Sequence, residues 1–216
     1  MNAQGKIVKL KAPPENARKH ILDAAAKLFA EHGYVATTMR DIAEETGIKA
    51  GSIYYHFSAK EQLLDEVMRI GVERVFDQVK AAVNSLPPES SVRAKLAAAI
   101  HAHLFSALAL GHYTKVNIRC TNTLPEAIRQ HYKRTRRPYE RYWRQLIQAG
   151  VDNGEIEASQ DSLSYSLYIF GFMNWTIEWY REGKFDLEEV SRRYADTLFD
   201  GIGRRETAGP GKPATK

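Results

Sequence analysis

A run of hydrogen-bonding side chains without formal charge, SIYYH, occupies residues 52–56. Ser52, Tyr54, Tyr55 and His56 offer hydroxyl and imidazole groups, which can exchange hydrogen bonds with base edges and phosphate oxygens. A short uncharged rod of this kind fits a groove of double-stranded DNA. The run therefore indicates recognition of nucleic acid by a helix.

Two short helices joined by a turn must position these side chains. Thr38 followed three residues later by Asp41 forms a capping box, which predicts the start of the first helix. Gly47 predicts its end, because glycine adopts the left-handed backbone that closes a helix. The second helix is expected from about residue 50 to residue 56, with Ile53 on its apolar side. The arrangement is a helix-turn-helix.

Helical periodicity continues through the rest of the chain, and no strand pattern or repeat interrupts it. Ser58 and Glu61 predict a second capping box, at the start of a long helix that runs to about Leu86. Pro138 predicts a kink in a later helix. The other helices are expected at 17–33, 91–110, 113–124, 125–153, 162–181 and 186–202. The sequence therefore predicts an all-α protein.

The breaks in this pattern divide the chain into four parts. Residues 1–16 form a polar, basic arm that we expect to be flexible, and residues 205–216 form a tail that we expect to be disordered. Residues 17–70 are expected to fold as a three-helix DNA-binding domain, and residues 71–204 as a larger helical domain. The long helix crosses the boundary near Gly71 and would link the two domains.

Composition argues against several classes of protein. No apolar run approaches the roughly 20 residues of a membrane span, and the polar amino terminus lacks the apolar core of a signal peptide. We therefore expect a cytoplasmic protein with no membrane partner. The single Cys120 cannot form an internal disulfide. Glycine-rich phosphate loops, metal-ligand clusters and nucleophile elbows are missing from the sequence, so we expect no enzyme activity, no metal and no cofactor.

The motifs around the helix-turn-helix resemble those of a known family. From Arg18 to Val67 the chain carries, at the family's spacing, Gly33-Tyr34, Thr37, Asp41-Ile42-Ala43, Gly47-Ile48, Gly51-Ser52, Tyr54-Tyr55-His56-Phe57 and Lys60-Glu61. These residues are similar to the DNA-binding domain of the tetracycline-repressor (TetR) family of bacterial regulators. The resemblance implies a small three-helix reader before a larger helical domain that dimerises through its last two helices.

The resemblance also implies a symmetric complex with DNA. A homodimer would bind an operator of double-stranded DNA that is an inverted repeat, through successive major grooves. Ala50, Ser52 and Tyr55 would lie nearest the base edges. The other residues expected at the DNA, mainly on phosphates, are Thr37, Thr38, Arg40, Lys49, Gly51, Tyr54, His56 and Lys60. Lys49 departs from the family, which usually has Ser or Thr there as a helix cap.

Segments in the second half of the chain look similar to the branch of this family that responds to acyl-CoA thioesters from lipid, steroid or aromatic-acid breakdown. They read RPYER at 137–141, GEI at 154–156, GFMNW at 171–175 and WYREG at 179–183. An apolar chain with a polyanionic head needs an aromatic pocket beside a cationic mouth. The residues expected to bind this ligand are Phe105, Leu108, Arg137, Tyr139, Arg141, Trp143, Arg144, Ile147, Phe170, Asn174 and Trp175.

The helix expected at 162–181 is apolar on nearly every side and must be buried on every side, for which a second subunit is the economical partner. The residues expected at the dimer interface are Phe172, Trp179, Tyr194, Leu198 and Ile202. Three alternatives stay open. The effector could be neutral or cationic, with the arginines as a solvated face; the protein could bind DNA without a ligand or cavity; or an enzyme site could exist only in the tertiary structure.

Overall fold

The computed structural model describes residues 17–121, 124–157 and 161–202, and within these ranges it consists of helices and connecting turns without a strand. The helices are α1 (Ala17–His32), α2 (Met39–Thr46), α3 (Ala50–His56), α4 (Lys60–Asn84), α5 (Val92–Leu110), α6 (His112–Arg119), α7 (Glu126–Asp152), α8 (Ser162–Trp179) and α9 (Leu187–Ile202). The all-α prediction is confirmed. The predicted arm and tail lie outside the described residues.

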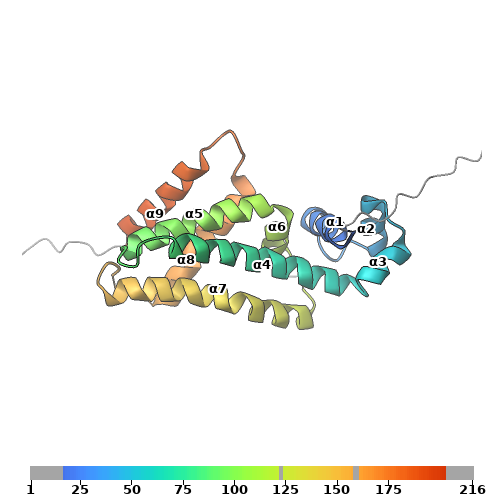
Figure 1. The fold of residues 1–216 in the computed structure, drawn as a ribbon, viewed down its shortest axis with the longest axis horizontal. Helices are drawn as coiled ribbons and strands as arrows, with labels where there is room; N and C mark the ends of the chain where they lie inside the picture. Colours follow the sequence, from blue (N-terminus) through green and yellow to red (C-terminus); the bar gives the residue numbers. More distant parts are fainter. Residues whose placement is uncertain (1–16, 122–123, 158–160, 203–216) are drawn as a thin grey trace, which may run out of the picture.

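Helix α4 runs through the length of the molecule and connects two groups of helices (Figure 1). Helices α1, α2 and α3 lie at its amino-terminal end, whereas α5 and α7 pack along it, α8 packs on α7 and α5, α9 packs on α5, and α6 lies between the two groups. The buried face of α4 extends from Leu63 through Val72 to Val83. The expected link is therefore one continuous helix that packs on both groups, while the domain boundary near Gly71 stays a prediction.

The first half of the helix-turn-helix forms as its sequence predicts. The hydroxyl of Thr38 accepts a hydrogen bond from the backbone N–H of Asp41 (3.2 Å), and the Asp41 carboxylate accepts one from the backbone N–H of Thr38 (2.8 Å). Gly47 closes α2 with a left-handed backbone at φ 66°. The N–H of Ile48 then donates to the carbonyl of Ala43 (3.2 Å). Local capping chemistry therefore fixes both ends of α2.

The capping box predicted at Ser58 and Glu61 is wrong. Helix α4 begins at Lys60, with Ala59 at the cap position. Ser58 donates from its backbone N–H (2.9 Å) and its hydroxyl (3.2 Å) to the side-chain oxygen of Gln62. The Glu61 carboxylate accepts a hydrogen bond from the hydroxyl of Tyr34 (2.7 Å), a tertiary contact that the sequence pattern could not reveal.

Two later helices end earlier than expected. Helix α6 ends at Arg119, with Cys120 at its C-cap, instead of continuing toward Leu124. Helix α8 stops at Trp179 instead of Arg181, because Tyr180 takes extended backbone at ψ 136°. Helix α7 continues through Pro138, and the kink expected there stays a prediction.

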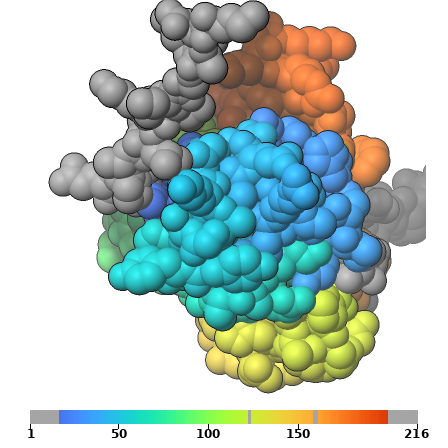
Figure 2. Space-filling view, turned by 90° about the vertical axis from the view of Figure 1, so that its right-hand side faces the viewer, coloured from blue at the N-terminus to red at the C-terminus, as the bar shows by residue number. Residues whose placement is uncertain are grey.

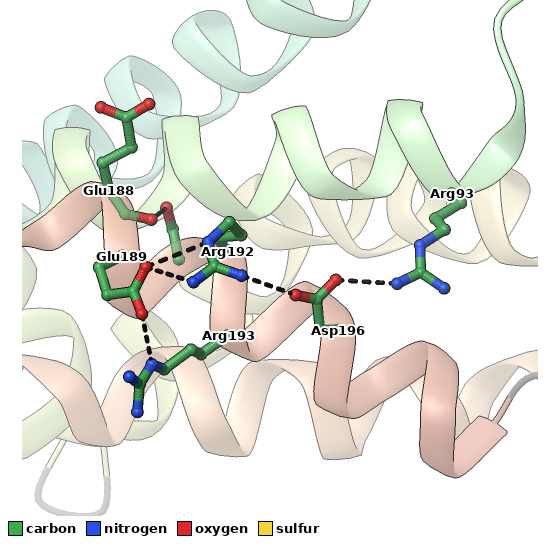
Figure 3. A network of polar contacts seen from close by, with 7 residues as sticks. Arg93, Glu188, Glu189, Arg192, Arg193 and Asp196 are labelled. Atoms are coloured by element: carbon green, nitrogen blue, oxygen red, sulfur yellow. Dashed lines mark hydrogen bonds and ion pairs between the residues drawn. The ribbon is translucent and has the colours of Figure 1, made fainter.

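The last helix is held to α5 by a chain of ion pairs on the surface (Figure 3). Asp196 of α9 accepts from Arg93 of α5 (2.8 Å) and from Arg192 of its own helix (3.2 Å). Arg192 and Arg193 also pair with Glu189. These side chains are largely solvated, so each pair contributes about 0–1 kcal/mol and the apolar contacts beneath them dominate the attachment.

Among the described helices, no single one is both long and apolar enough to cross a membrane. Helices α5 and α6 reach that length and apolar composition only as a pair, and they are bent by 102° at their junction.

Candidate nucleic-acid interface and ligand cavity

Helix α3 presents a polar side to solvent at the end of the molecule that faces the viewer in Figure 2. Tyr55 is 86% exposed and Tyr54 is 53% exposed, whereas Ile53 and Phe57 are fully buried. The exposed residues of this helix are Ala50, Gly51, Ser52, Tyr54 and Tyr55. Because the apolar side anchors the helix, its hydrogen-bonding side is free to enter a groove.

Four further residues of the predicted interface lie at or near this surface. Thr38, Arg40 and Lys49 are exposed, and His56 is half-buried with its ring against that of Tyr55 at a centroid distance of 5.2 Å. Arg40 pairs with Glu44 one turn along α2 (3.1 Å) in full contact with solvent. Lys49 caps α3 without a side-chain hydrogen bond, which leaves its ammonium group available to a phosphate.

Thr37 and Lys60 hold the loop before α2 instead of projecting from the surface. The Thr37 side chain is buried, and its hydroxyl donates to the carbonyl of Gly33 (2.9 Å). The ammonium of Lys60 donates to the carbonyls of Tyr34 (2.8 Å) and Thr37 (2.6 Å). It also lies over the Tyr34 ring, 4.3 Å from the centroid. Their contact with phosphates stays a prediction, but both side chains already have internal partners.

A cavity of about 240 Å³ lies between five helices. Helices α4, α5, α6, α7 and α8 all contribute to its wall. Its lining consists of Gly71, Val72, Val75, His103, Ala107, Thr114, Asn117, Ile118, Thr121, Tyr132, Arg136, Tyr139, Phe170, Asn174 and Ile177. The wall is mainly apolar and aromatic with a few polar groups, which is the usual character of a small-molecule site.

Two buried polar side chains of the wall form a pair. Nδ1 of His103 lies 2.6 Å from the hydroxyl of Tyr139, and both side chains are buried. Burial, together with a smaller effect of the positive charge of Arg136, lowers the pKa of His103 to about 3. Burial raises the pKa of Tyr139 well above its usual value. Both groups are therefore neutral at physiological pH.

Among the described residues that line the cavity, Arg136 is the one with a positively charged side chain. Its Nε lies 2.9 Å from the Glu140 carboxylate, and its guanidinium lies 5.5 Å from the centroid of the Phe170 ring. Its side chain is 30% exposed, so the charge sits where the cavity meets solvent. A partly exposed guanidinium with one carboxylate partner retains donors for an anionic ligand.

The structure places the predicted ligand residues in three different environments. Tyr139, Phe170 and Asn174 line the cavity. Trp143 and Ile147 are fully buried, and the Trp143 ring packs on those of Tyr139 and Phe170 with centroid distances of 6.3 and 5.8 Å. The remaining residues lie outside the cavity wall and are Phe105, Leu108, Arg137, Arg141, Arg144 and Trp175.

Helical phase explains why Arg136 lines the cavity and Arg137 does not. Tyr132, Arg136 and Tyr139 follow one another at spacings of four and three residues and share one face of α7. Arg137 and Arg141 fall on the exposed side of the helix. Sequence reasoning missed both Arg136 and His103, although the spacing of Arg136 from two tyrosines was a usable signal.

The outer face of α8 carries a patch of exposed apolar side chains. Its members are Leu163, Leu167, Tyr168, Phe172 and Trp175, each at least half exposed. Among the predicted interface residues, Phe172 belongs to this patch, and its ring lies 6.1 Å from that of Tyr194. Leu198 is buried within the protomer, Trp179 is half-buried, and the side chain of Ile202 lies outside the described residues.

Comparison with known proteins identifies relatives along most of the chain. The family description "Bacterial regulatory proteins, tetR family" matches residues 21–67, and "Tetracyclin repressor-like, C-terminal domain" matches residues 89–202. The HTH-type transcriptional repressor KstR2 of Rhodococcus jostii (strain RHA1) is 28% identical over 188 residues, which cover 86% of this chain and 90% of that protein.

Two solved structures share the fold. The ketosteroid transcriptional regulator KstR2 of Mycobacterium tuberculosis superposes with a TM-score of 0.77 at 24% identity, covering 88% of this chain and 97% of that chain. AibR, solved in complex with isovaleryl coenzyme A and operator DNA, superposes with a TM-score of 0.72 at 23% identity, covering 84% and 97%. At these identities, the two superpositions establish the common fold.

Proposed function

Because this chain belongs to the tetracycline-repressor family of transcriptional regulators, we propose that it is a cytoplasmic, dimeric repressor released from its operator by an acyl-CoA thioester. The observation that carries the proposal is the cavity between α4 and α8, which joins an aromatic wall to a partly exposed arginine. A closed, densely packed second group of helices would have favoured a DNA-binding protein without a ligand, and the cavity argues against that alternative.

The apolar patch on α8 supports a dimer. Leu163, Leu167 and Trp175 recur at helical spacing on one side of α8 and are 50%, 59% and 67% exposed. A contiguous exposed patch of this kind marks an interaction surface. Two-fold packing of α8 and α9 would cover it in a four-helix bundle, and a stable dimer is expected to bury more than roughly 1,000 Å². Two copies of α3 would then read an inverted repeat.

The volume of the cavity favours a binding mode in which the acyl group lies inside the cavity and the CoA part lies outside it. At about 240 Å³ it lies just below the usual range for a whole drug-sized ligand, roughly 300–1,000 Å³. It can take an acyl group but not the CoA nucleotide as well. Arg136 at the solvent boundary would bind the anionic part outside, because guanidinium groups bind phosphate through paired donors. The ketosteroid regulator and the isovaleryl-CoA complex among the similar proteins support this class of effector.

Helix α6 contacts both the cavity and the DNA-binding helices, so it can couple ligand binding to their position. Thr114 and Asn117 on one side of α6 line the cavity. The same helix also contacts α1, since the hydroxyl of Tyr113 donates to Asp23 of α1 (2.8 Å) and Arg119 donates to the carbonyl of Ala30 (3.1 Å). A ligand that displaces α6 or the adjacent α4 would therefore tilt α1 and the reader. A coupling of about 1–3 kcal/mol suffices for derepression.

A DNA-release assay tests the proposed function. The operator is first found by selecting bound fragments from upstream DNA, and release is then measured with a series of acyl-CoAs, the matching free acids and CoA alone. We expect release by thioesters only. Release by free acids at the same concentrations would indicate a neutral or simple carboxylate effector, and no release by any compound would refute the thioester.

A further inference from the structure

The inner wall of the cavity holds a hydrogen-bond donor that no described residue satisfies. His103 is 5% exposed and uses Nδ1 for its contact with Tyr139. Its second ring nitrogen, Nε2, is buried and has no partner among the described residues. A buried polar atom without a partner costs about 1–3 kcal/mol, so its retention in the cavity wall requires a reason.

The contact with Tyr139 determines which ring nitrogen carries the proton. The phenol O–H is a stronger acid than a neutral imidazole N–H, so in this short contact the Tyr139 hydroxyl donates and Nδ1 accepts. The proton of the neutral ring must then lie on Nε2. Tyr139 therefore positions His103 as a donor, in the way that second partners fix the tautomer of other functional histidines.

A second unsatisfied atom lies in the same wall. The side-chain oxygen of Asn117 on α6 is buried and has no partner among the described residues. Arg136 is 30% exposed at its side chain, whereas His103 is enclosed, so the two polar elements lie at different depths. A ligand that enters with its charged end at Arg136 would bring its uncharged end to His103.

We propose that His103 is a specificity-determining residue that donates from Nε2 to an oxygen carried by the acyl portion of the effector, a ketone carbonyl or a hydroxyl group. This inference rests on the proposed function, because it takes the cavity as the effector site. The effector is then an oxygenated acyl group and not a plain saturated chain. A hydroxyl group could also donate to the Asn117 oxygen, whereas a saturated chain would leave both buried atoms unsatisfied.

Small probes test the donor without the CoA part. An engineered apolar cavity of about 150 Å³ binds benzene, so a cavity of about 240 Å³ accepts a six-membered ring. Cyclohexanone and methylenecyclohexane have nearly the same shape and differ in the C=O that can accept a hydrogen bond. Their dissociation constants for the full-length protein are measured by NMR titration, together with the ¹⁵N shifts of the histidine rings.

The expected result is that cyclohexanone binds about tenfold more tightly than methylenecyclohexane, the ratio that one net hydrogen bond supplies. His103→Leu should remove this preference, and His103→Gln, whose amide can accept from Tyr139 and donate to the ketone, should retain part of it. His101→Leu is the matched control, because His101 lies on the same helix outside the cavity wall and should change nothing. Circular dichroism shows whether each variant is folded.

Several outcomes would overturn the inference. They are equal binding of the two probes, binding of neither, and an equal loss of affinity for both in His103→Leu. A second titration separates this inference from the proposed function by comparing hexanoyl-CoA with 5-oxohexanoyl-CoA. Equal release by both thioesters would reject the role of His103 and leave the proposed thioester-responsive repressor intact. A ketone preference in the small probes without release by any thioester would support the role of His103 and reject the thioester as effector.

Discussion

Gly71 of α4 lies directly against Tyr113 and Asn117 of α6. A Cβ on Gly71 would lie 2.9 Å from the Tyr113 carbonyl oxygen and 2.3 Å from the Asn117 side-chain nitrogen. Glycine is required here for close approach of two helices and not for backbone conformation. This contact joins α4, which connects the two groups of helices, to α6, which contacts α1.

Gly71→Ala should therefore separate α4 from α6 and destabilise the protein by about 1–3 kcal/mol, as overpacking does. Urea denaturation at equilibrium measures the change. Gly51→Ala is the control, since a Cβ there meets open space. An unfolding free energy for Gly71→Ala equal to that of the wild type would show that the helices can separate without cost.

Replacing Tyr55 and Lys49 should have different effects on operator binding. Tyr55 is exposed on α3, so Tyr55→Ala should cost about 1–3 kcal/mol at its preferred base pairs and relax sequence preference. Lys49→Ala should weaken binding to all sequences alike and lower the salt slope by about one, because one phosphate contact is lost. Binding titrations at several salt concentrations on operator and scrambled DNA distinguish the two. A sequence-dependent loss in Lys49→Ala would contradict these assignments.

Charge placed in the apolar patch of α8 should produce monomers. Leu167→Arg and Phe172→Arg put a guanidinium at exposed positions, so each variant should fold while the two-fold contact is lost. Leu198 is a poor site for this test, because it is buried within the protomer. Val35→Arg, at a 73% exposed residue of the loop between α1 and α2 and outside the patch, is the control. Light scattering gives the mass, and a dimeric Leu167→Arg would place the interface elsewhere.

Arg136 and Arg137 provide a matched pair for locating the anionic part of the effector. Arg136→Ala should weaken thioester binding by about ten- to a hundredfold, the range for a hydrogen bond to a charged group. Arg137→Ala should have little effect, since this side chain lies outside the cavity wall. Calorimetry with a releasing acyl-CoA measures both. A larger loss in Arg137→Ala would place the phosphates on the outer face of α7.

The buried histidine should make the protein less stable in mild acid. His103 has a pKa of about 3 in the folded state against an ordinary value of 6.5. Between these pH values its side chain is therefore protonated in the unfolded chain and neutral in the folded chain. This contribution to stability is complete above pH 6.5 and falls by about 1.4 kcal/mol per pH unit as the pH decreases toward 3. Urea midpoints at pH 7.5 and 5.5 should differ more in the wild type than in His103→Leu. Equal differences would mean that His103 is protonated in the folded protein.

The sequence by itself determined the helix-turn-helix and most of the helix bounds. Thr38, Asp41 and Gly47 act on backbone groups within a few residues, so their effect is local and readable. The apolar period of α4 likewise predicts a long helix with one buried face. The family resemblance rests on the same local motifs.

Only the tertiary structure decided which side chains meet. The sequence predicted Tyr139, Phe170 and Asn174 as ligand-binding residues, and all three line the cavity. It did not predict the pairing of His103 with Tyr139, which joins residues that are 36 positions apart. Lys60 bonds inward to the Tyr34 carbonyl because three helices converge there. The physical reason is that periodicity fixes the direction of a side chain around its own axis, whereas the cavity depends on how five helix axes pack against one another.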